Sequence, residues 1–145
     1  DDYRRLIRAV RRDDEFVGFL WLQQDAYQED EVRCRFALAP PGRAAWDFDV
    51  HVEPAFRMGR AFARLWEAAN AHLRERGVEW SLSRISAFNP DSVRAHERMH
   101  SRRIGGGVFV RAGSLQVALL DRAPYAHVSW RDASFPVLRL DAGAA

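Results

Sequence analysis

The chain has 145 residues, a length that suits one domain with a single sizeable hydrophobic core. Hydrophobic residues make up 48% and charged residues 29%, which excludes a chain that is disordered over most of its length. The formal net charge of +2 excludes a strong field for nucleic acid, and no apolar run approaches the roughly 18 residues of a membrane helix. The single cysteine, Cys34, cannot form an intrachain disulfide and is expected to be a small strand residue. We therefore expect a cytoplasmic protein without a nucleic-acid or membrane partner.

The first forty residues predict strands that are joined by polar turns. Residues 1–12 allow either an amphipathic helix or a strand, and the Asp13-Asp14 turn signal favours a strand that forms a hairpin with the next one. Residues 15–23 are rich in β-favouring types and predict a strand. A polar loop at residues 24–31 and an alternating strand at residues 32–38 are expected to follow.

Residues 45–52 carry the clearest strand pattern, because apolar and polar side chains alternate along them. The expected apolar face is Trp46, Phe48, Val50 and Val52, and the expected polar face is Asp47, Asp49 and His51. Pro54 ends this strand, and a helix is expected from about Gly59 to Arg76. Its helical stripe, which predicts packing on a sheet, is Phe62, Leu65, Trp66, Ala69 and Leu73.

The second half of the chain predicts a strand at residues 79–88 and a helix that opens at Asn89-Pro90, with asparagine as the N-cap and proline at the first helical position. A hairpin around Ala112-Gly113 follows, and residues 121–145 form an extension with an extra strand expected at residues 135–140. This order of elements predicts a single α+β domain over residues 1–145, built on a mixed sheet.

The segment that leads from the strand at residues 45–52 into the first helix can hold an anion. A helix start presents unpaired backbone N–H groups and the positive end of the helix dipole, where phosphates bind. Gly59 lets a ligand approach the backbone, and Arg57 and Arg60 add two guanidinium groups. An ordinary strand–helix connection with solvated arginines is an equally good interpretation of this segment alone.

Three polar residues lie at helical spacing on one side of the second helix, namely Asn89, Ser92 and His96. An N-cap role explains Asn89 without a ligand, and a lone histidine on a helix is more often structural than functional. His96 and His100 are spaced as metal ligands on a helix could be, but no third ligand is evident, so no metal site is expected. If the strand at residues 79–88 neighbours the strand at residues 45–52, two helix starts would border one ligand slot.

Residues 16–120 resemble the GNAT superfamily of N-acetyltransferases. The resemblance rests on Val52-x-Pro54 before a glycine-bearing turn and a helix, on Asn89-x-x-Ser92-x-x-x-His96 where the family has N-x-x-S-x-x-x-Y, and on the closing hairpin. It implies a mostly antiparallel central sheet flanked by helices, with the family's N-terminal helices reduced or missing. It also implies acetyl-CoA as co-substrate, with no metal. The implied cofactor-binding residues are Val50, Val52, Arg57, Met58, Gly59, Arg60, Ala61, Phe62, Asn89 and Ser92.

The resemblance also implies acyl transfer to a primary amine, carried by a small molecule or a peptide, by direct attack on the thioester. His96, at the family's tyrosine position, would protonate the departing thiolate, since an imidazole can donate a proton near neutral pH. Asp47, Asp49, Glu53 or His51 could accept the amine proton, and we select Glu53 and Asp49 as the candidates.

Two other functions remain open. A turn with one glycine and an N-terminal part that is short for an acceptor pocket are equally compatible with a domain that binds CoA without catalysis. The apolar C-terminal segment around Trp130 and residues 135–140 could instead pair two copies of the chain by strand addition, which would make the protein a homodimer or an interaction module.

Overall fold

The computed structural model describes residues 4–10, 15–57 and 60–144, with side chains described from residue 15 onward. The chain forms two compact units, each of which is described by itself. Unit 1 contains residues 1–26 and 40–83, and unit 2 contains residues 27–39 and 84–145. The expectation of a single domain stays a prediction. None of the helices in the described ranges is long and apolar enough to cross a membrane.

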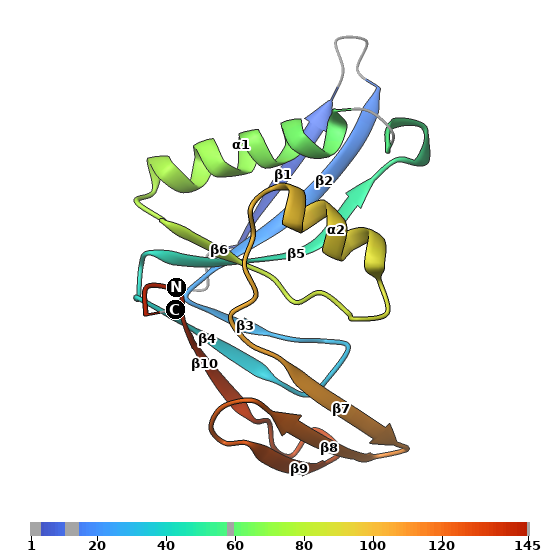
Figure 1. The fold of residues 1–145 in the computed structure, drawn as a ribbon, viewed down its shortest axis with the longest axis vertical. Coiled ribbons are helices and arrows are strands. Elements are labelled where there is room, and N and C mark those ends of the chain that lie inside the picture. The colour runs from blue at the N-terminus through green and yellow to red at the C-terminus, as the bar shows by residue number, and fades with distance from the viewer. Residues whose placement is uncertain (1–3, 11–14, 58–59, 145) are drawn as a thin grey trace. The chain divides into compact units, whose positions relative to one another are not determined.

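Unit 1 is a four-stranded sheet with one long helix lying across it (Figure 1). The strand order is β1-β2-β5-β6, with β5 and β6 parallel and the other neighbours antiparallel. The elements are β1 (Arg4–Val10), β2 (Phe16–Gln24), β5 (Ala44–Val52), α1 (Ala61–Glu75) and β6 (Trp80–Leu82). The hairpin interpretation of the N-terminus is confirmed for its two strands, while the turn predicted at Asp13-Asp14 lies outside the described residues.

The core of unit 1 is explained by two periodic patterns in the sequence, the two-residue period of a strand and the 3.6-residue period of a helix. Alternate residues of β2 point to one face, and Leu20 and Leu22 on that face are almost fully buried. Helix α1 packs on β1, β2 and β5, and it buries the stripe that the helical spacing predicted. Leu65 and Ala69 of that stripe have no exposed surface, whereas Phe62 is only partly buried.

A β-bulge in β5 corrects the predicted alternation of that strand. The register with β2 shifts by one residue between Phe48 and His51, where Asp49 adopts a φ of 51°. Because one extra residue reverses the pleat, His51 stacks on Phe19 on the same face as the stacked pair of Trp21 and Phe48. The expectation that His51 shares a face with Asp47 was therefore wrong.

Unit 2 consists of two three-stranded sheets and a short helix. One sheet has the order β10-β4-β3, with β10 parallel to β4, and the other is the antiparallel sheet β7-β8-β9. The elements are β3 (Ala26–Gln28), β4 (Arg35–Ala39), α2 (Pro90–Arg98), β7 (Gly107–Ala112), β8 (Leu115–Leu120), β9 (Ala126–Trp130) and β10 (Val137–Asp141). The predicted hairpin and the extra C-terminal strand are confirmed.

Three predictions of extent were wrong. The strand expected at residues 79–88 is only three residues long, because β6 ends at Leu82. Strand β3 lies inside the segment that was expected to be a loop, and β9 lies in the segment expected to be irregular. Both missed strands are short, and each pairs with a strand that is near it in the chain, β3 with β4 and β9 with β8.

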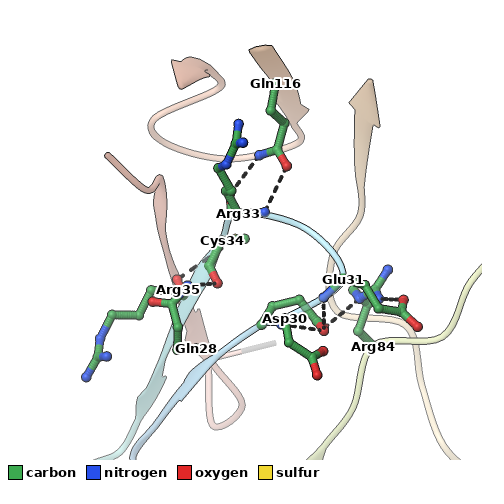
Figure 2. A network of polar contacts seen from close by, with 9 residues as sticks. Gln28, Asp30, Glu31, Arg33, Cys34, Arg35, Arg84 and Gln116 are labelled. Carbon is green, nitrogen blue, oxygen red and sulfur yellow. Dashed lines mark hydrogen bonds and ion pairs between the residues drawn. The ribbon is translucent and has the colours of Figure 1, made fainter. Parts of the chain in front are cut away.

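A buried polar network joins the loop between β3 and β4 to other parts of unit 2 (Figure 2). Gln116 accepts a hydrogen bond from the backbone N–H of Arg33 at 2.8 Å and donates one to the carbonyl of Arg33 at 2.9 Å. Arg84 donates from Nε to Glu29 at 2.7 Å and also pairs with Glu31. Gln116, Arg33 and Glu29 are buried whereas Glu31 is exposed, and we interpret the buried part of the network as structural.

Candidate functional site

The pairing of strand β5 with its neighbour β6 ends partway along β5. The parallel pairing covers only three residue pairs, the last of which joins Trp46 to Leu82. On that side of β5, no strand of the described part of the chain continues the ladder along residues 47–52. The bulge at Asp49 lies within this open stretch. An extended ligand could therefore form strand-like hydrogen bonds with the free edge of β5.

Gly18 allows the close approach of β2 and β5 next to the bulge. A Cβ atom at this position would lie 2.4 Å from the carbonyl oxygen of His51 and 3.1 Å from the Cα of Val52. Only a residue without a side chain fits there, so the end of β5 is held in place by a backbone contact. The sequence predicted a strand over residues 15–23 but assigned no role to this glycine.

The turn after β5 leads directly to the start of helix α1. Residues 54–56 form a 3₁₀ turn, and the Arg57 side chain donates from Nε to the carbonyl of Val52 at 2.8 Å. Arg60 is the N-cap of α1, and its side chain makes no capping hydrogen bond. The first backbone N–H groups of α1, beginning at Ala61, are therefore available to an anion. Met58 and Gly59, which were predicted to bind the cofactor, lie outside the described residues.

Asp47 is the buried acidic residue of unit 1. It has 3% of its surface exposed, and the hydroxyl of Ser81 on β6 donates to its Oδ1 at 2.9 Å. Its Oδ2 is also buried and makes no hydrogen bond of ordinary geometry with the described residues. Burial raises the pKa of Asp47 to about 7, against the opposing effect of the Ser81 and Ser83 side chains. A carboxyl group with this pKa can exchange a proton near neutral pH.

The two carboxylates selected from the sequence have different surroundings. Asp49 is exposed and lies at the bulge, so its backbone conformation is the unusual feature of this position. Glu53 is partly exposed, and its Oε1 lies 3.2 Å from Nε2 of His51. Asp47 was one of four residues considered for the amine proton and was not selected. Its strand pattern predicted an ordinary solvated face, whereas in the structure Asp47 pairs with the buried Leu22 of β2 and is itself buried.

The three residues expected on α2 lie together on that helix. Asn89 is the N-cap, and its Oδ1 accepts from the backbone N–H of Ser92 at 3.1 Å. His96 is buried, and its Nδ1 lies 2.8 Å from the carbonyl oxygen of Ser92. Because that carbonyl can only accept, Nδ1 carries a hydrogen atom, and Nε2 is itself a buried atom.

The predicted site residues are divided between the two units. Unit 1 holds the candidates of β5, of the following turn and of the start of α1, which are Asp49, Val50, Val52, Glu53, Arg57, Arg60, Ala61 and Phe62. Unit 2 holds Asn89, Ser92 and His96. The structure therefore brings each of these sets together within its own unit. The described residues contain no cluster of three or more His, Cys, Asp or Glu that could hold a metal ion.

Solved structures with the same fold include acetyltransferases. The chain matches a protein of Bacillus halodurans that was solved as a point mutant, with a TM-score of 0.59, 10% identity and coverage of 75% of this chain and 66% of that one. It matches a candidate acetyl transferase of Pyrococcus furiosus, with a TM-score of 0.54, 17% identity and coverage of 77% and 67%. It also matches an acetyltransferase of Trypanosoma brucei, with a TM-score of 0.53, 14% identity and coverage of 75% and 69%.

These matches establish the fold. The chain has a mixed α+β, acetyltransferase-like fold in which most neighbouring strands are antiparallel, as the sequence predicted. It spans about two thirds of the length of the structures that it matches. No protein-family model and no curated protein matches the sequence.

Proposed function

We propose that the protein is a GNAT-type N-acetyltransferase, which transfers the acetyl group of acetyl-CoA to a primary amine by direct attack. The observation that carries this proposal is the free edge of β5 beyond Trp46, followed by the uncapped start of α1. The free edge suits the amide groups of pantetheine, and the helix start suits the pyrophosphate. The acceptor would be a small amine or a peptide.

The proposed division of roles assigns one proton transfer to β5 and one to α2. A carboxylate of β5 accepts the amine proton, and Asp47 is preferred to Asp49 and Glu53 because burial gives Asp47 a pKa of about 7. Since the Ser81 hydroxyl donates to Asp47, that hydroxyl could relay the proton from an amine to the buried carboxylate. His96, in its imidazolium form with a hydrogen on both ring nitrogens, would give the Nε2 proton to the thiolate and become the neutral ring that keeps its hydrogen on Nδ1.

The first test is binding. We expect acetyl-CoA and CoA to raise the melting temperature of the protein, and acetyl-CoA to support release of free thiol when a panel of primary amines is added. Cys34 should contribute little to a thiol assay, because it is buried and burial raises its pKa to about 11, which disfavours the reactive thiolate. The absence of any thermal shift at millimolar acetyl-CoA would contradict the proposal.

The second test separates catalysis from binding. Asp47→Asn is expected to lower kcat about 100-fold while acetyl-CoA binding is retained, because a general base contributes roughly 10²–10⁴-fold to rate. The wild-type rate should rise with pH through about 7, as Asp47 loses its proton, and the variant should lack this rise. Asp49→Asn and Glu53→Gln are the matched variants, and a larger loss in either one would transfer the role of base to it.

A domain that binds CoA without catalysis is the alternative, and the same experiments distinguish it. Binding of acetyl-CoA with no turnover over the amine panel would favour that alternative. His96→Phe tests the acid separately. If kcat and the alkaline limb of its pH profile are unchanged in this variant, His96 does not protonate the leaving group.

A further inference from the structure

Unit 2 contains an open cavity of about 480 Å³, a volume in the range of small-molecule sites. Its wall is formed by parts of two segments, residues 122–127, which lead from β8 into β9, and residues 135–139, which lead into β10. Among the described residues that line it, Arg122, His127 and Arg139 are basic, the others are apolar and none is acidic. The cavity therefore suits an anion that carries an apolar body.

The guanidinium group of Arg122 is held in place at the wall of this cavity. Its Nε donates to Oδ1 of Asp121 at 3.2 Å, and its Nη2 donates to the carbonyl of Ile104. It also packs closely against Gly105, where a Cβ atom would lie 2.9 Å from Nη2. Its Nη1 makes no hydrogen bond with the described residues. A guanidinium group that is already fixed, with two N–H donors left over, loses little freedom when it binds an oxyanion.

Two further arginines of unit 2 have no acidic partner. Arg139 lies on β10 and Arg35 on β4, both are exposed, and neither side chain makes a hydrogen bond or ion pair with the described residues. The parallel register pairs Arg35 with Val137 and Ala37 with Arg139, so the two arginines are diagonal neighbours on one face. Figure 2 shows the Arg35 side chain extending away from the buried network. The two positive charges repel each other, and a bound anion would remove this repulsion.

The acidic residues nearest in the sequence do not pair with Arg35 or Arg139. Residues 115–145 contain three acidic side chains, and each accepts from other groups: Asp121, Asp132 and Asp141. Asp141 lies two positions after Arg139 and shares its side of β10, but its Oδ1 accepts from the backbone N–H groups of residues 143 and 144. An excess of positive charge therefore remains beside the cavity.

We propose that this cavity binds a small phosphate monoester with an apolar body. The two unpaired guanidinium groups match the charge of a phosphate monoester at neutral pH, about −1.5 to −2. Together with Nη1 of Arg122 they supply three guanidinium groups for three oxygens on one phosphorus atom. Phe135 and Val137 provide an apolar wall for the rest of the ligand. None of the lining residues is assigned to acetyl-CoA above, so this inference stands independently of the proposed acetyltransferase activity.

Isothermal titration calorimetry of the full chain with phenyl phosphate, without acetyl-CoA, tests this proposal. Benzoate has the apolar ring but a single charge, and inorganic phosphate has the charge but no apolar body. We expect phenyl phosphate to bind about tenfold more tightly than either one, because each control lacks one of the two contributions. No binding of phenyl phosphate at about 10 mM would overturn the proposal. Equal binding of benzoate would overturn the assignment of a doubly charged group, and equal binding of inorganic phosphate that of an apolar body.

Three arginine variants assign the binding to this cavity. Arg139→Gln and Arg35→Gln should each weaken phenyl phosphate binding about tenfold, because each loses a charge-assisted hydrogen bond to the phosphate. Both side chains are exposed, so neither substitution disturbs the core. Arg111→Gln is the matched control, since Arg111 is an exposed arginine of β7 that does not line the cavity. An equal loss in Arg111→Gln would show a general attraction of anions to the chain and would contradict the proposed site.

A second measurement uses only the wild type. The backbone amide NMR signals that phenyl phosphate shifts most are expected to belong to residues 122–127 and 135–139. Shifts confined to other parts of the chain would contradict the proposal. Saturating acetyl-CoA should leave the affinity for phenyl phosphate unchanged, whereas displacement would assign the phosphate site to the cofactor and overturn it as a separate site. Loss of the acetyltransferase proposal alone would leave these expectations unchanged.

Discussion

The sheet of unit 1 and the sheet β7-β8-β9 of unit 2 depart from the usual distribution of side chains in opposite ways. In unit 1 a carboxyl group, Asp47, is buried next to the point where β5 leaves β6. In unit 2 the polar groups Gln116 and Ser129 are buried while valines and a tryptophan on the opposite face are exposed. Both arrangements cost stability in an isolated chain, one by burying a carboxyl group and the other by exposing apolar side chains.

Two buried polar side chains, Gln116 of one sheet and Asp47 of the other, differ in their hydrogen bonds, although Oγ of Ser129, opposite Gln116, also makes none with the described residues. The side-chain amide of Gln116 makes two hydrogen bonds with the backbone of Arg33, so its burial is compensated. Asp47 has one oxygen bonded to Ser81 and the other without a partner of ordinary geometry in the described part of the chain. A compensated group holds a structure together, whereas an undercompensated carboxyl group is poised to change its protonation state.

The largest expected effect is the pH dependence that Asp47 imposes on stability. Its pKa of about 7 in the folded protein is above the value in the unfolded chain, so folding is favoured while the carboxyl is protonated. This contribution is fully present below about pH 4 and is lost as the pH rises to about 7. The difference in unfolding free energy between wild type and Asp47→Asn should change by up to about 4 kcal/mol over that interval.

Urea unfolding at several pH values measures this difference. Ser81→Ala is the companion variant, because the Ser81 hydroxyl opposes the rise in the pKa of Asp47. Its loss should extend the fall in stability to higher pH. If the difference in unfolding free energy between wild type and Asp47→Asn did not change with pH, Asp47 would be ionised in the folded protein. The contrast between the buried polar groups of the two sheets would then disappear.

The next effect concerns the backbone contact that holds β5 at its bulge. Gly18→Ala places a methyl group 2.4 Å from the carbonyl oxygen of His51, so the two strands must move apart. We expect a loss of about 2–3 kcal/mol in the free energy of unfolding, in the range for overpacked positions. Gly113→Ala adds a methyl at a turn with free space but a φ of +57°, and should cost less, about 1 kcal/mol. Equal losses would mean that the contact at Gly18 relaxes freely.

A comparable but smaller effect is expected for the buried amide of unit 2. Gln116→Ala leaves the backbone N–H and carbonyl of Arg33 without their buried partners and should cost about 2 kcal/mol. Gln24→Ala is the control, because the exposed side chain of Gln24 makes its bonds near the surface. Chemical unfolding monitored by far-UV circular dichroism gives both values. A cost at Gln116 no greater than that at Gln24 would show that water replaces the lost bonds.

The smallest expected effect is on cofactor affinity at the start of α1. Under the proposed function, Arg57→Ala should weaken acetyl-CoA binding about tenfold, since a charge-assisted hydrogen bond to phosphate is worth about 1.5 kcal/mol. Arg74→Ala, in the last turn of the same helix, removes the same charge far from the helix start and should leave affinity unchanged. Isothermal titration calorimetry compares the two variants. Equal affinities would place the pyrophosphate elsewhere.

The sequence by itself determined the elements whose pattern is local. The buried stripe of helix α1 follows the 3.6-residue period of its apolar residues. Asn89-Pro90 indicates the start of α2, and apolar and polar residues alternate in β7 and β8 on either side of a two-residue turn. The strand β5 and its place beside β6 could also be expected from alternation and the order of elements. These features depend on neighbours a few residues away, so the sequence is sufficient to predict them.

The tertiary structure alone decided what depends on distant pairing. The bulge at Asp49 arises from the register between β5 and β2 and reverses the side of His51, which no alternation pattern could predict. The early end of β6 leaves residues 47–52 of β5 without a strand on that side among the described residues, and the Ser81 hydroxyl donates to the buried Asp47. The alternating pattern of β7, β8 and β9 likewise does not determine which face of their sheet is buried. An alternating strand does not specify which face is covered, and here the bonds of Gln116 to Arg33, 83 residues away, select the polar one.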